Sequence, residues 1–425
     1  MKYETIKGRD FNYDVCQKGV EQIIFTDEVA PKGVELTDLS NDFDGSVVGW
    51  LEDHGVYKVS TQVEGQKVIF NEDCSYMFHS RTVSNIKSIY FNNIDTSHVT
   101  SMKGMFSWCE KLKELDLNNF DTSNVIDMNN MFTDCYELEN IELSRLDTSN
   151  VTNMSHMFQG CESLEKLDLR TFDTNKVTNI SHMFYECKNL KNLDLSGLRT
   201  SKVENMGCLF YSCYSLETIN LNCLDTSHVT DMNNMFHRCL ALCELDITPM
   251  DTSKVENMSW MFDKCENLKN LDLSNLDTSK AVDMHGMFNE CKKLQELNLS
   301  NFNTSFVVNM SEMFYGCSNL ESINLSSFNT SQVLDMAEMF CKCKNLKELD
   351  VTNMELLSSV NTYDIFSECE KLNCLKATDK QLKALYEYEE LLASHQNQVH
   401  PNIDPKNLQM NKRKEMQKDK GIDKE

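Results

Sequence analysis

The sequence predicts an α/β repeat solenoid, a curved stack of 26-residue strand–turn–helix units. Two observations predict it: cysteine recurs every 26 residues eleven times without a gap, and phenylalanine recurs at the same interval three residues earlier. A fixed period of this length is typical of stacked supersecondary units, because each unit buries its apolar face only against a neighbour. The two columns comprise Cys109, Cys135, Cys161, Cys187, Cys213, Cys239, Cys265, Cys291, Cys317, Cys343 and Cys369, and Phe106, Phe132, Phe158, Phe184, Phe210, Phe236, Phe262, Phe288, Phe314, Phe340 and Phe366.

Residues 112–137 illustrate one unit. An L-x-x-L-x-L pattern that begins at Leu112 predicts a short strand with alternating inward and outward residues. The run Asp121-Thr122-Ser123 supplies side-chain oxygens suited to a turn and to a helix cap. Apolar residues from Val125 to Phe132 then follow at helical spacing, which predicts a helix. Neighbouring strands lie about 4.8 Å apart and packed helices about 8–10 Å apart, so the stack is expected to curve with its strands on the concave face. This is the leucine-rich-repeat pattern.

Four regions follow from where the period begins and ends. We expect a β-rich N-terminal cap over residues 1–74, with a hairpin whose strands, 56–60 and 66–70, flank Glu64-Gly65. The solenoid itself is expected over residues 75–377. A capping helix over 378–398 is predicted from its spaced leucines and tyrosine, and a disordered charged tail over 399–425 from its lack of apolar periodicity.

Composition excludes several classes of function. The net charge of −25 argues against nucleic acid and against anionic membrane surfaces as partners, because both require a basic face. The first residues show no secretory signal, and no window offers the roughly 18 apolar residues of a membrane helix. The periodic cysteines are interpreted as small buried side chains with free thiols, since no CxxC motif indicates zinc or redox chemistry.

The repeat resembles a known family. The run Phe-Asp-Thr-Ser-Asn-Val at 120–125, followed by Met128 and Met131-Phe132, is similar to the 26-residue unit of BspA-like leucine-rich-repeat proteins, a unit also found in mycoplasma-type lipoproteins. The lead-in Ser75-Tyr76-Met77-Phe78 is similar as well, and the resemblance covers roughly residues 30–375. It implies a bacterial surface protein that acts in adhesion, with no catalytic residues.

The concave strand face is the expected binding surface. Its central outward column is rich in carboxylates, which allows two interpretations: an acidic groove for a cationic or hydrogen-bonding protein partner, or a solvated face that keeps the protein soluble. The candidate partner-binding residues are Asp116, Glu142, Asp168, Asp194, Asp246, Asp272 and Asp350.

Two other columns suggest metals, but the first is expected to form turns and caps and the second to lie on the convex surface. The aspartates that begin with Asp95 and Asp121 lack the glycine-rich turn and the oxygen number of a calcium site, so turn formation is the simpler role. His156, His182 and Cys208 share one helix column and suit zinc by type, but a helix spacing of about 8–10 Å would keep them from one ion. No catalytic residues, cofactor or metal are therefore expected.

The resulting hypothesis is a non-catalytic protein-binding scaffold that uses its concave strand face. The resemblance implies adhesion to host or neighbouring cells or to matrix, and hence a cell-surface or secreted location. The absence of a signal peptide favours the alternative, an intracellular scaffold or effector that binds a cytoplasmic partner through the same groove. A rigid spacer without specific partners is a third possibility.

Overall fold

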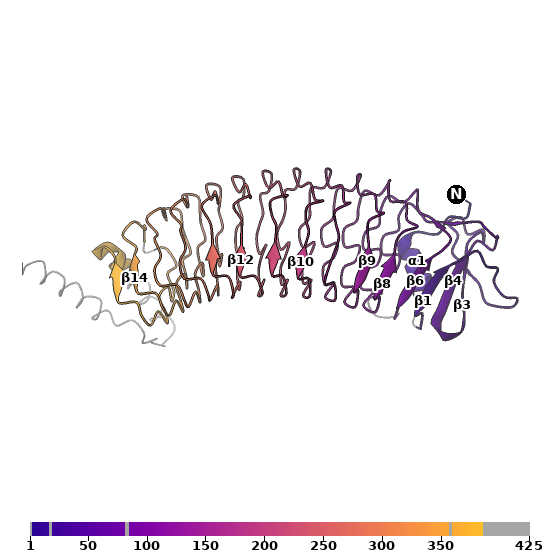
Figure 1. The fold of residues 1–425 in the computed structure, drawn as a ribbon, viewed down its shortest axis with the longest axis horizontal. Helices are drawn as coiled ribbons and strands as arrows, with labels where there is room; N and C mark the ends of the chain where they lie inside the picture. The colour runs from indigo at the N-terminus through magenta and orange to yellow at the C-terminus, as the bar shows by residue number, and fades with distance from the viewer. Residues whose placement is uncertain (1, 17–18, 81–84, 357–358, 386–425) are drawn as a thin grey trace, which may run out of the picture. The chain divides into compact units, whose positions relative to one another are not determined.

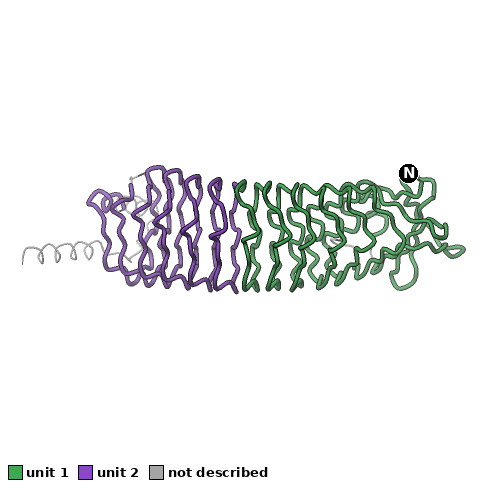
Figure 2. Tube along the Cα trace, turned by 45° about the horizontal axis from the view of Figure 1, so that its top comes forward, with its two compact units in different colours: residues 1–229 green, residues 230–425 purple. Residues whose placement is uncertain are grey.

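The computed structural model describes residues 2–16, 19–80, 85–356 and 359–385. Contacts within the chain divide it into two compact units, Met1–Val229 and Thr230–Glu425 (Figure 2). Both units are built from successive 26-residue turns of the chain, here called coils. The predicted region boundaries at residues 74 and 377 stay predictions, because the division at Val229 falls within the repeats.

The first unit opens with a mixed sheet of order β2-β3-β4-β1-β6 (Figure 1). β1 runs parallel to both β4 and β6, and β3 runs antiparallel to β2 and β4. Because β6 is the strand of the first coil, the cap sheet continues directly into the repeats. The elements are α1 (Gly8–Val15), β1 (Gln22–Phe25), β2 (Thr37–Asp38), β3 (Val48–Leu51), η1 (Asp53–Gly55), β4 (Val56–Ser60), β5 (Val68–Ile69), β6 (Ser88–Phe91) and β7 (Ile94–Asp95).

The predicted hairpin is wrong. β4 does not pair with the segment that follows Glu64-Gly65; instead β5 pairs in parallel with β7, 26 residues further along. The turn after β4 is built from side-chain hydrogen bonds, with Gln62 N–H donating to Ser60 Oγ at 2.9 Å, and it leads the chain into a coil rather than back along the same strand. A glycine turn between two apolar runs is compatible with both arrangements.

Helix α1 covers the open end of the first coil. Gly8 N–H donates to the carbonyl of Asp73 at 2.8 Å. The Asn12 side-chain amide reaches the carbonyls of Met77 and His79 at 3.3 and 2.6 Å. These donors replace the hydrogen bonds that a preceding coil would supply to the carbonyls of Asp73, Met77 and His79.

Several later coils contribute a short parallel strand, and in the others the equivalent segment lacks one. In the first unit β8 (Glu114–Asp116) pairs with β9 (Asn140–Glu142), and β10 (Asn192–Leu193) pairs with β11 (Thr218–Ile219). In the second unit β12 (Glu244–Leu245) pairs with β13 (Asn270–Leu271), and β14 (Glu348–Asp350) pairs with β15 (Cys374–Lys376). A second ladder of single parallel bridges follows the strand in each coil, as in Asp127↔Asn153 and Asp283↔Asn309.

The predicted helix of each unit is wrong: within the described residues the repeats contain no α-helix from Met102 to Cys369. The segment Met102–Cys109 is a run of tight turns, closed by bonds such as Met105 N–H to Met102 O and Cys109 N–H to Phe106 O. The alternate N–H groups, including those of Met102 and Phe106, donate to carbonyls of the next coil. Half of the hydrogen bonds are thus made between coils, whereas an α-helix makes all of them within itself.

The turn run reproduces the spacing of an amphipathic helix. Met102, Met105, Phe106 and Cys109 are fully buried, which is the i, i+3, i+4, i+7 pattern. The backbone differs because the third residue of each turn has positive φ, as a type II turn requires. Gly104 and Trp108 have φ of 58° and 62°, and the equivalent residues of other coils repeat these values. Both sides of a coil therefore pair at strand spacing, so the predicted difference between 4.8 Å and 8–10 Å is absent.

The core of the repeats contains the phenylalanine and cysteine columns beside buried leucines, methionines and valines. In each unit the phenylalanine rings stack nearly parallel, for example Phe132 on Phe158 at 5.5 Å and Phe288 on Phe314 at 5.7 Å between centroids. Ten column thiols, in Cys109–Cys213 and Cys265–Cys369, donate to the phenylalanine carbonyl of the preceding coil, as Cys291 Sγ does to Phe262 O at 3.0 Å. None of the eighteen cysteines, all of them in the described residues, forms a disulfide, which confirms the interpretation of the column as thiols. Burial raises the pKa of Cys317 to about 12, so this thiol stays protonated and unreactive.

Buried threonines join each coil to the next. Thr252 Oγ1 donates to the carbonyl of Asp277 and accepts from the N–H of the same residue, both at 2.8 Å. Thr148 makes the same pair of bonds with Asp173. One hydroxyl thereby satisfies both polar groups of a peptide backbone at the bend between strand and turn run, where no strand pairing is available.

At the C-terminal end, residues 379–385 are helical. The Gln381 side-chain amide donates to the carbonyls of Val351 and Met354 at 2.7 and 2.6 Å, so this segment contacts the last coils. The remainder of the predicted capping helix, and the whole predicted tail over 399–425, lie outside the described residues.

Candidate functional site

The structure places all seven candidate carboxylates on the outward side of the strands, one per coil. In the first unit Asp116 lies beside Glu142 in the β8–β9 pair, and Asp168 pairs with Asp194 as a parallel bridge. In the second unit Asp246 and Asp272 follow the paired strands β12 and β13, and Asp350 lies beside Lys376 in the β14–β15 pair. All seven are exposed. We call this row the strand-face column.

Each of these carboxylates also closes a turn. Its oxygen accepts the backbone N–H two residues further on, at 2.9 Å for Asp194 with Ser196 and 2.9 Å for Asp272 with Ser274. Hydrogen bonds of this kind stabilise the ionised form and lower the pKa of both carboxyl groups below the ordinary value. The column therefore holds fixed negative charges with one oxygen tied to the backbone. This turn role was absent from both interpretations of the sequence.

Basic side chains partly neutralise the face. Arg170 forms a two-pronged pair with Asp168, at 3.0 and 2.6 Å, and this pair holds the pKa of Asp168 at about 2. At the edge of the same strands, Lys191 pairs with Glu165 at 3.3 Å and Lys347 with Glu321 at 2.7 Å. Asp246 and Asp272, like Asp116 and Glu142, have no cation within 4 Å among the described residues, so these two adjacent pairs hold uncompensated negative charge.

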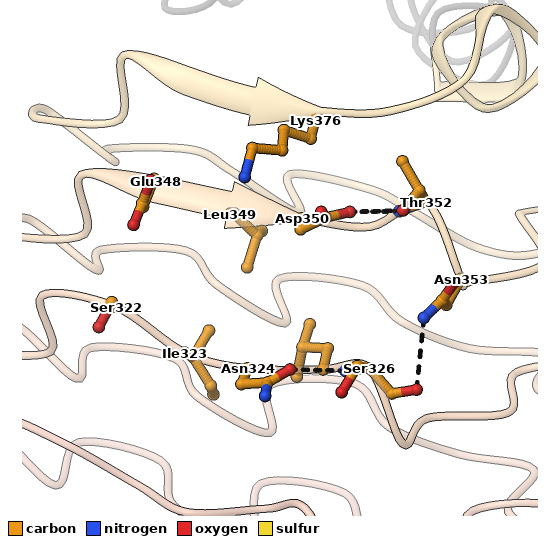
Figure 3. Close-up of a pocket in the computed structure, with 11 residues that line it drawn as sticks. Ser322, Ile323, Asn324, Ser326, Glu348, Leu349, Asp350, Thr352, Asn353 and Lys376 are labelled. Carbon is orange, nitrogen blue, oxygen red and sulfur yellow. Dashed lines mark hydrogen bonds between the residues drawn. The ribbon is translucent and has the colours of Figure 1, made fainter.

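A hollow of about 200 Å³ opens at the end of the strand face in the second unit (Figure 3). Lys376 projects from β15 toward β14, beside the carboxylates Glu348 and Asp350 (Figure 3). The floor includes Asn324, whose oxygen accepts Ser326 N–H at 2.9 Å. The hollow combines hydroxyl, amide, carboxylate and ammonium groups, so it can hydrogen-bond a polar side chain or a peptide group.

Of the candidate partner-binding residues predicted from the sequence, only Asp350 lines this hollow, although Asn324 and Lys376 belong to the same outward column. Lys376 shares the strand-face column but differs in charge, and Glu348 lies two residues earlier in the strand. The signal that could have found Glu348 is its own column, in which Glu114, Glu244 and Glu296 precede it.

The aspartate column that begins with Asp95 and Asp121 forms turns, as expected. Asp121 accepts the N–H of Ser123 at 3.0 Å, and Asp251 accepts that of Ser253 at 3.0 Å. Because the segment that follows is a turn run, these side chains cap turns rather than helices. Among the described residues no group of three or more histidine, cysteine, aspartate or glutamate side chains could hold a metal ion.

The histidine column lies closer together than its predicted helix spacing. The His156 and His182 rings stack at 4.4 Å between centroids, and Tyr185 stacks on Tyr211 at the same distance. His156 Nδ1 lies 2.6 Å from Gln159 Oε1, while His182 Nδ1 is buried with no hydrogen-bond partner among the described residues. Burial, and then the neighbouring His156, lowers the pKa of His182 from 6.5 to about 4.

This stack predicts a loss of stability in acid. The unfolded chain binds a proton at His182 near pH 6.5 and the folded chain only near pH 4, so the free energy of unfolding falls as the pH drops through this interval. Because the ring is only half-buried, we expect a loss of about 1–2 kcal/mol. His182→Asn should remove it, since Asn130 occupies the same left-handed position with φ of 60°.

Urea unfolding at pH 7.5 and 4.5 measures the effect. The matched control is His98→Asn, because His98 is exposed and Asn124 and Asn150 occupy its column. An equal acid loss in wild type and in His182→Asn would refute the assignment.

The family of the chain follows from four overlapping matches. Residues 72–192, 113–219, 182–299 and 282–398 match the family described as "Mycoplasma protein of unknown function, DUF285". The chain belongs to this family. The DUF285 matches extend over residues 72–398, so they include the repeats of both units. They confirm the resemblance to mycoplasma-type repeats, while the resemblance to BspA-like proteins stays a prediction.

Solved structures add only distant likenesses to this DUF285 chain. A leucine-rich-repeat protein from Eubacterium ventriosum is 15% identical with a TM-score of 0.32, covering 77% of this chain and 88% of its own. A leucine-rich-repeat protein from Leptospira interrogans is 14% identical with a TM-score of 0.22, covering 75% and 78%. TLR13, in a complex with ssRNA13, is 17% identical with a TM-score of 0.25; the match covers 66% of this chain and 42% of TLR13.

No curated protein matches the chain. Within the described residues, no helix combines the length and the apolar character needed to cross a membrane.

Proposed function

We propose that this protein is a non-catalytic binding scaffold whose strand face recognises a partner protein with cationic and hydrogen-bonding side chains. The observation that supports the proposal is the strand-face column, in which exposed carboxylates recur at one coil interval and are held ionised by their own turns. Repeat stacks present extended surfaces of this kind for binding. Fixed negative charges favour a positively charged partner and fix its register along the strands.

Asp246 and Asp272 form one adjacent pair of carboxylates that is expected to contribute to binding. They lie in adjacent coils and repel each other, since the Asp272 charge acts to raise the pKa of Asp246 against the turn bonds that lower it. A lysine or arginine of a partner placed between them would relieve this repulsion. The hollow around Lys376 would then accept a polar group of the same partner further along the face.

The test removes charge without breaking the turns. Asparagine already occupies the column at Asn298 and Asn324, where its side-chain oxygen accepts the same N–H at 3.1 and 2.9 Å. The triple variant Asp194→Asn, Asp246→Asn, Asp272→Asn should therefore fold as wild type does, whereas lysine at these positions would lose the turn bond.

Binding is measured with three labelled peptides that share their apolar residues and differ in carrying Lys, Gln or Glu. Wild type should bind the Lys peptide about tenfold more tightly than the Glu peptide at low salt, and the triple variant should lose that preference. Equal binding of the Lys peptide by wild type and the folded triple variant would reject the strand face as the binding surface.

The finer proposal, taken from the BspA-like resemblance, is that the partner lies on a host or neighbouring cell or in the matrix. Protease treatment of intact source cells tests it, with a cytosolic protein as control. Cleavage of this protein without cleavage of the cytosolic control would support adhesion. Full protection would instead favour the alternative of an intracellular scaffold that uses the same strand face.

A further inference from the structure

A second surface of the Thr230–Glu425 unit exposes apolar side chains in adjacent coils. Val282, Val308 and Leu334 share one column, with 44%, 37% and 62% of their surfaces exposed, and Phe306 is 59% exposed. Val308 N–H donates to Val282 O, and Leu334 N–H to Val308 O, both at 2.9 Å, so the three side chains stack at coil spacing. Phe306 lies two residues before Val308, in the turn that Val307 N–H closes on the Thr304 carbonyl at 3.1 Å. We call these four residues the lateral stripe.

The fold does not require apolar residues in the lateral stripe. The column of Phe306 holds Asn124 and Asn150 in other coils, and the column of Val308 holds Thr152 and Thr178. Thr152 N–H makes the same bond to the preceding coil, at 2.9 Å. The core contact is supplied instead by the buried residues between the two columns, such as Val307. Exposed apolar side chains that gather where polar ones suffice indicate an interaction surface.

The size of the stripe favours a short segment over a second copy of this chain. Four partly exposed side chains offer an apolar patch of a few hundred Å². A stable interface uses roughly 800 Å² from each partner. A dimer would therefore need a large area beyond the stripe, whereas a peptide segment with two or three apolar side chains would fit within it.

The charge beside the stripe selects among such segments. Lys254 and Lys280 precede Phe306 in its column, and Glu256 precedes Val282 in the other. Asp283 and Asp335 directly follow Val282 and Leu334, but both are half-buried and accept the N–H groups of His285 and Ala337 in their own turns. The chain as a whole carries −25. No carboxylate lies within 4 Å of the Lys280 amine among the described residues, so this charge is available to a ligand.

We propose that the lateral stripe binds a short segment of a partner protein in which apolar side chains are followed by a carboxylate. The apolar side chains pack on Phe306, Val308 and Leu334, and the carboxylate meets Lys280. This preference is opposite in charge to that of the strand face, so the protein would hold two different partners, or two parts of one partner, at once.

The test is a selection of twelve-residue peptides from a displayed random library against the full-length protein. The variant used for counter-selection is Phe306→Asn, Val308→Thr, Leu334→Thr, which takes residues that the same columns accept elsewhere. Peptides that distinguish the two proteins should be rich in apolar residues and in Asp or Glu. Each should lose about tenfold or more in affinity on the triple variant.

Two further variants separate the contributions. Lys280→Glu should bind more tightly those versions of the selected peptides in which Asp or Glu is replaced by Lys. Ile126→Thr removes an isolated exposed residue from the column of Val308 and should leave peptide affinity unchanged. Selected peptides should still bind the Asp246→Asn, Asp272→Asn protein, which separates this surface from the strand face. Selected peptides without an acidic bias, or failure of the selection to find any peptide that distinguishes the variants, would overturn the proposal.

Sedimentation of the full chain at rising concentration tests whether a second copy of this chain covers the lateral stripe instead. A single mass for wild type and triple variant is expected. A dimer that the triple variant abolishes would show that a second copy covers the stripe, and would also overturn the proposal.

Discussion

Deleting residues 277–302, one complete 26-residue period of the second unit, should give a shorter protein that still unfolds cooperatively. The deletion joins Leu276 to Asn303, which takes the place of Asp277 above Thr252. Thr252 and Thr278 make equivalent bonds to residues 25 positions later, so the new neighbours can form the bond that the deletion removes. The slope of the urea unfolding curve should fall in proportion to the lost surface.

Deleting residues 277–289, half a period, should unfold the coils on both sides of the junction. It would place Glu290, from a turn run, where a turn aspartate is needed, and shift every inter-coil bond out of register. Limited proteolysis and circular dichroism should show cleavage near the junction and loss of ordered signal. Comparable stability of the two deletions would be inconsistent with a stack in which each coil pairs with its neighbours.

Phe288→Ala should lower the free energy of unfolding by about 3–5 kcal/mol. Phe288 is fully buried, and its ring stacks between those of Phe262 and Phe314 at 5.6 and 5.7 Å. The coils above and below are tied by backbone bonds every second residue, so they cannot close over the missing ring. The resulting cavity retains most of its volume.

Urea unfolding of three variants measures this cost. Phe288→Leu should lose less than Phe288→Ala, because it keeps most of the buried volume. Phe306→Ala is the matched control, since Phe306 belongs to the same unit but is 59% exposed, and should change stability by about 0.5 kcal/mol or less. Equal losses for Phe288→Ala and Phe306→Ala would mean that the ring column does not form the core.

Periodicity predicted which side chains are buried but not the backbone that buries them. The cysteine and phenylalanine columns, the turn aspartates and the outward carboxylates all lie on the sides of the coil that the sequence indicates. The predicted α-helix was wrong because a run of tandem turns buries Met102, Met105, Phe106 and Cys109 at the spacing that an amphipathic helix would also have. A clue was present: glycine occurs at the left-handed positions in Gly104, Gly160, Gly286 and Gly316. The glycine pattern is incomplete in other coils, because His156, Trp260 and Glu290 adopt positive φ at the equivalent positions.

The candidate site was predictable only in part, for a related reason. Asp194 and Asp272 could be placed on the strand face from the alternation of the strand, but their bonds to Ser196 and Ser274 depend on the local turn geometry. The hollow near Lys376 depends on side-chain packing in the last coils, where the repeat pattern no longer constrains each residue.

The hydrogen bonds of the turn runs also give each unit an electrical polarity. In the coil that contains Met128, the N–H groups of residues 128, 130, 132 and 134 all point to the next coil, and the carbonyls of residues 127, 129, 131 and 133 all point to the previous one. Four peptide dipoles per coil therefore align along the stacking direction. At about 4.8 Å per coil this is one aligned peptide per roughly 1.2 Å, compared with about 1.5 Å in an α-helix.

The turn runs thus act as a macrodipole without a helix. Its negative end is the carbonyl row of the first coil, which receives the N–H of Gly8 and the amide of Asn12. In the second unit the positive end is the last coil, where Asp364 and Glu368 provide negative charge. Neutral donors therefore satisfy the negative end in the first unit, whereas carboxylates lie at the positive end in the second unit, as negative charge does at the positive end of a helix.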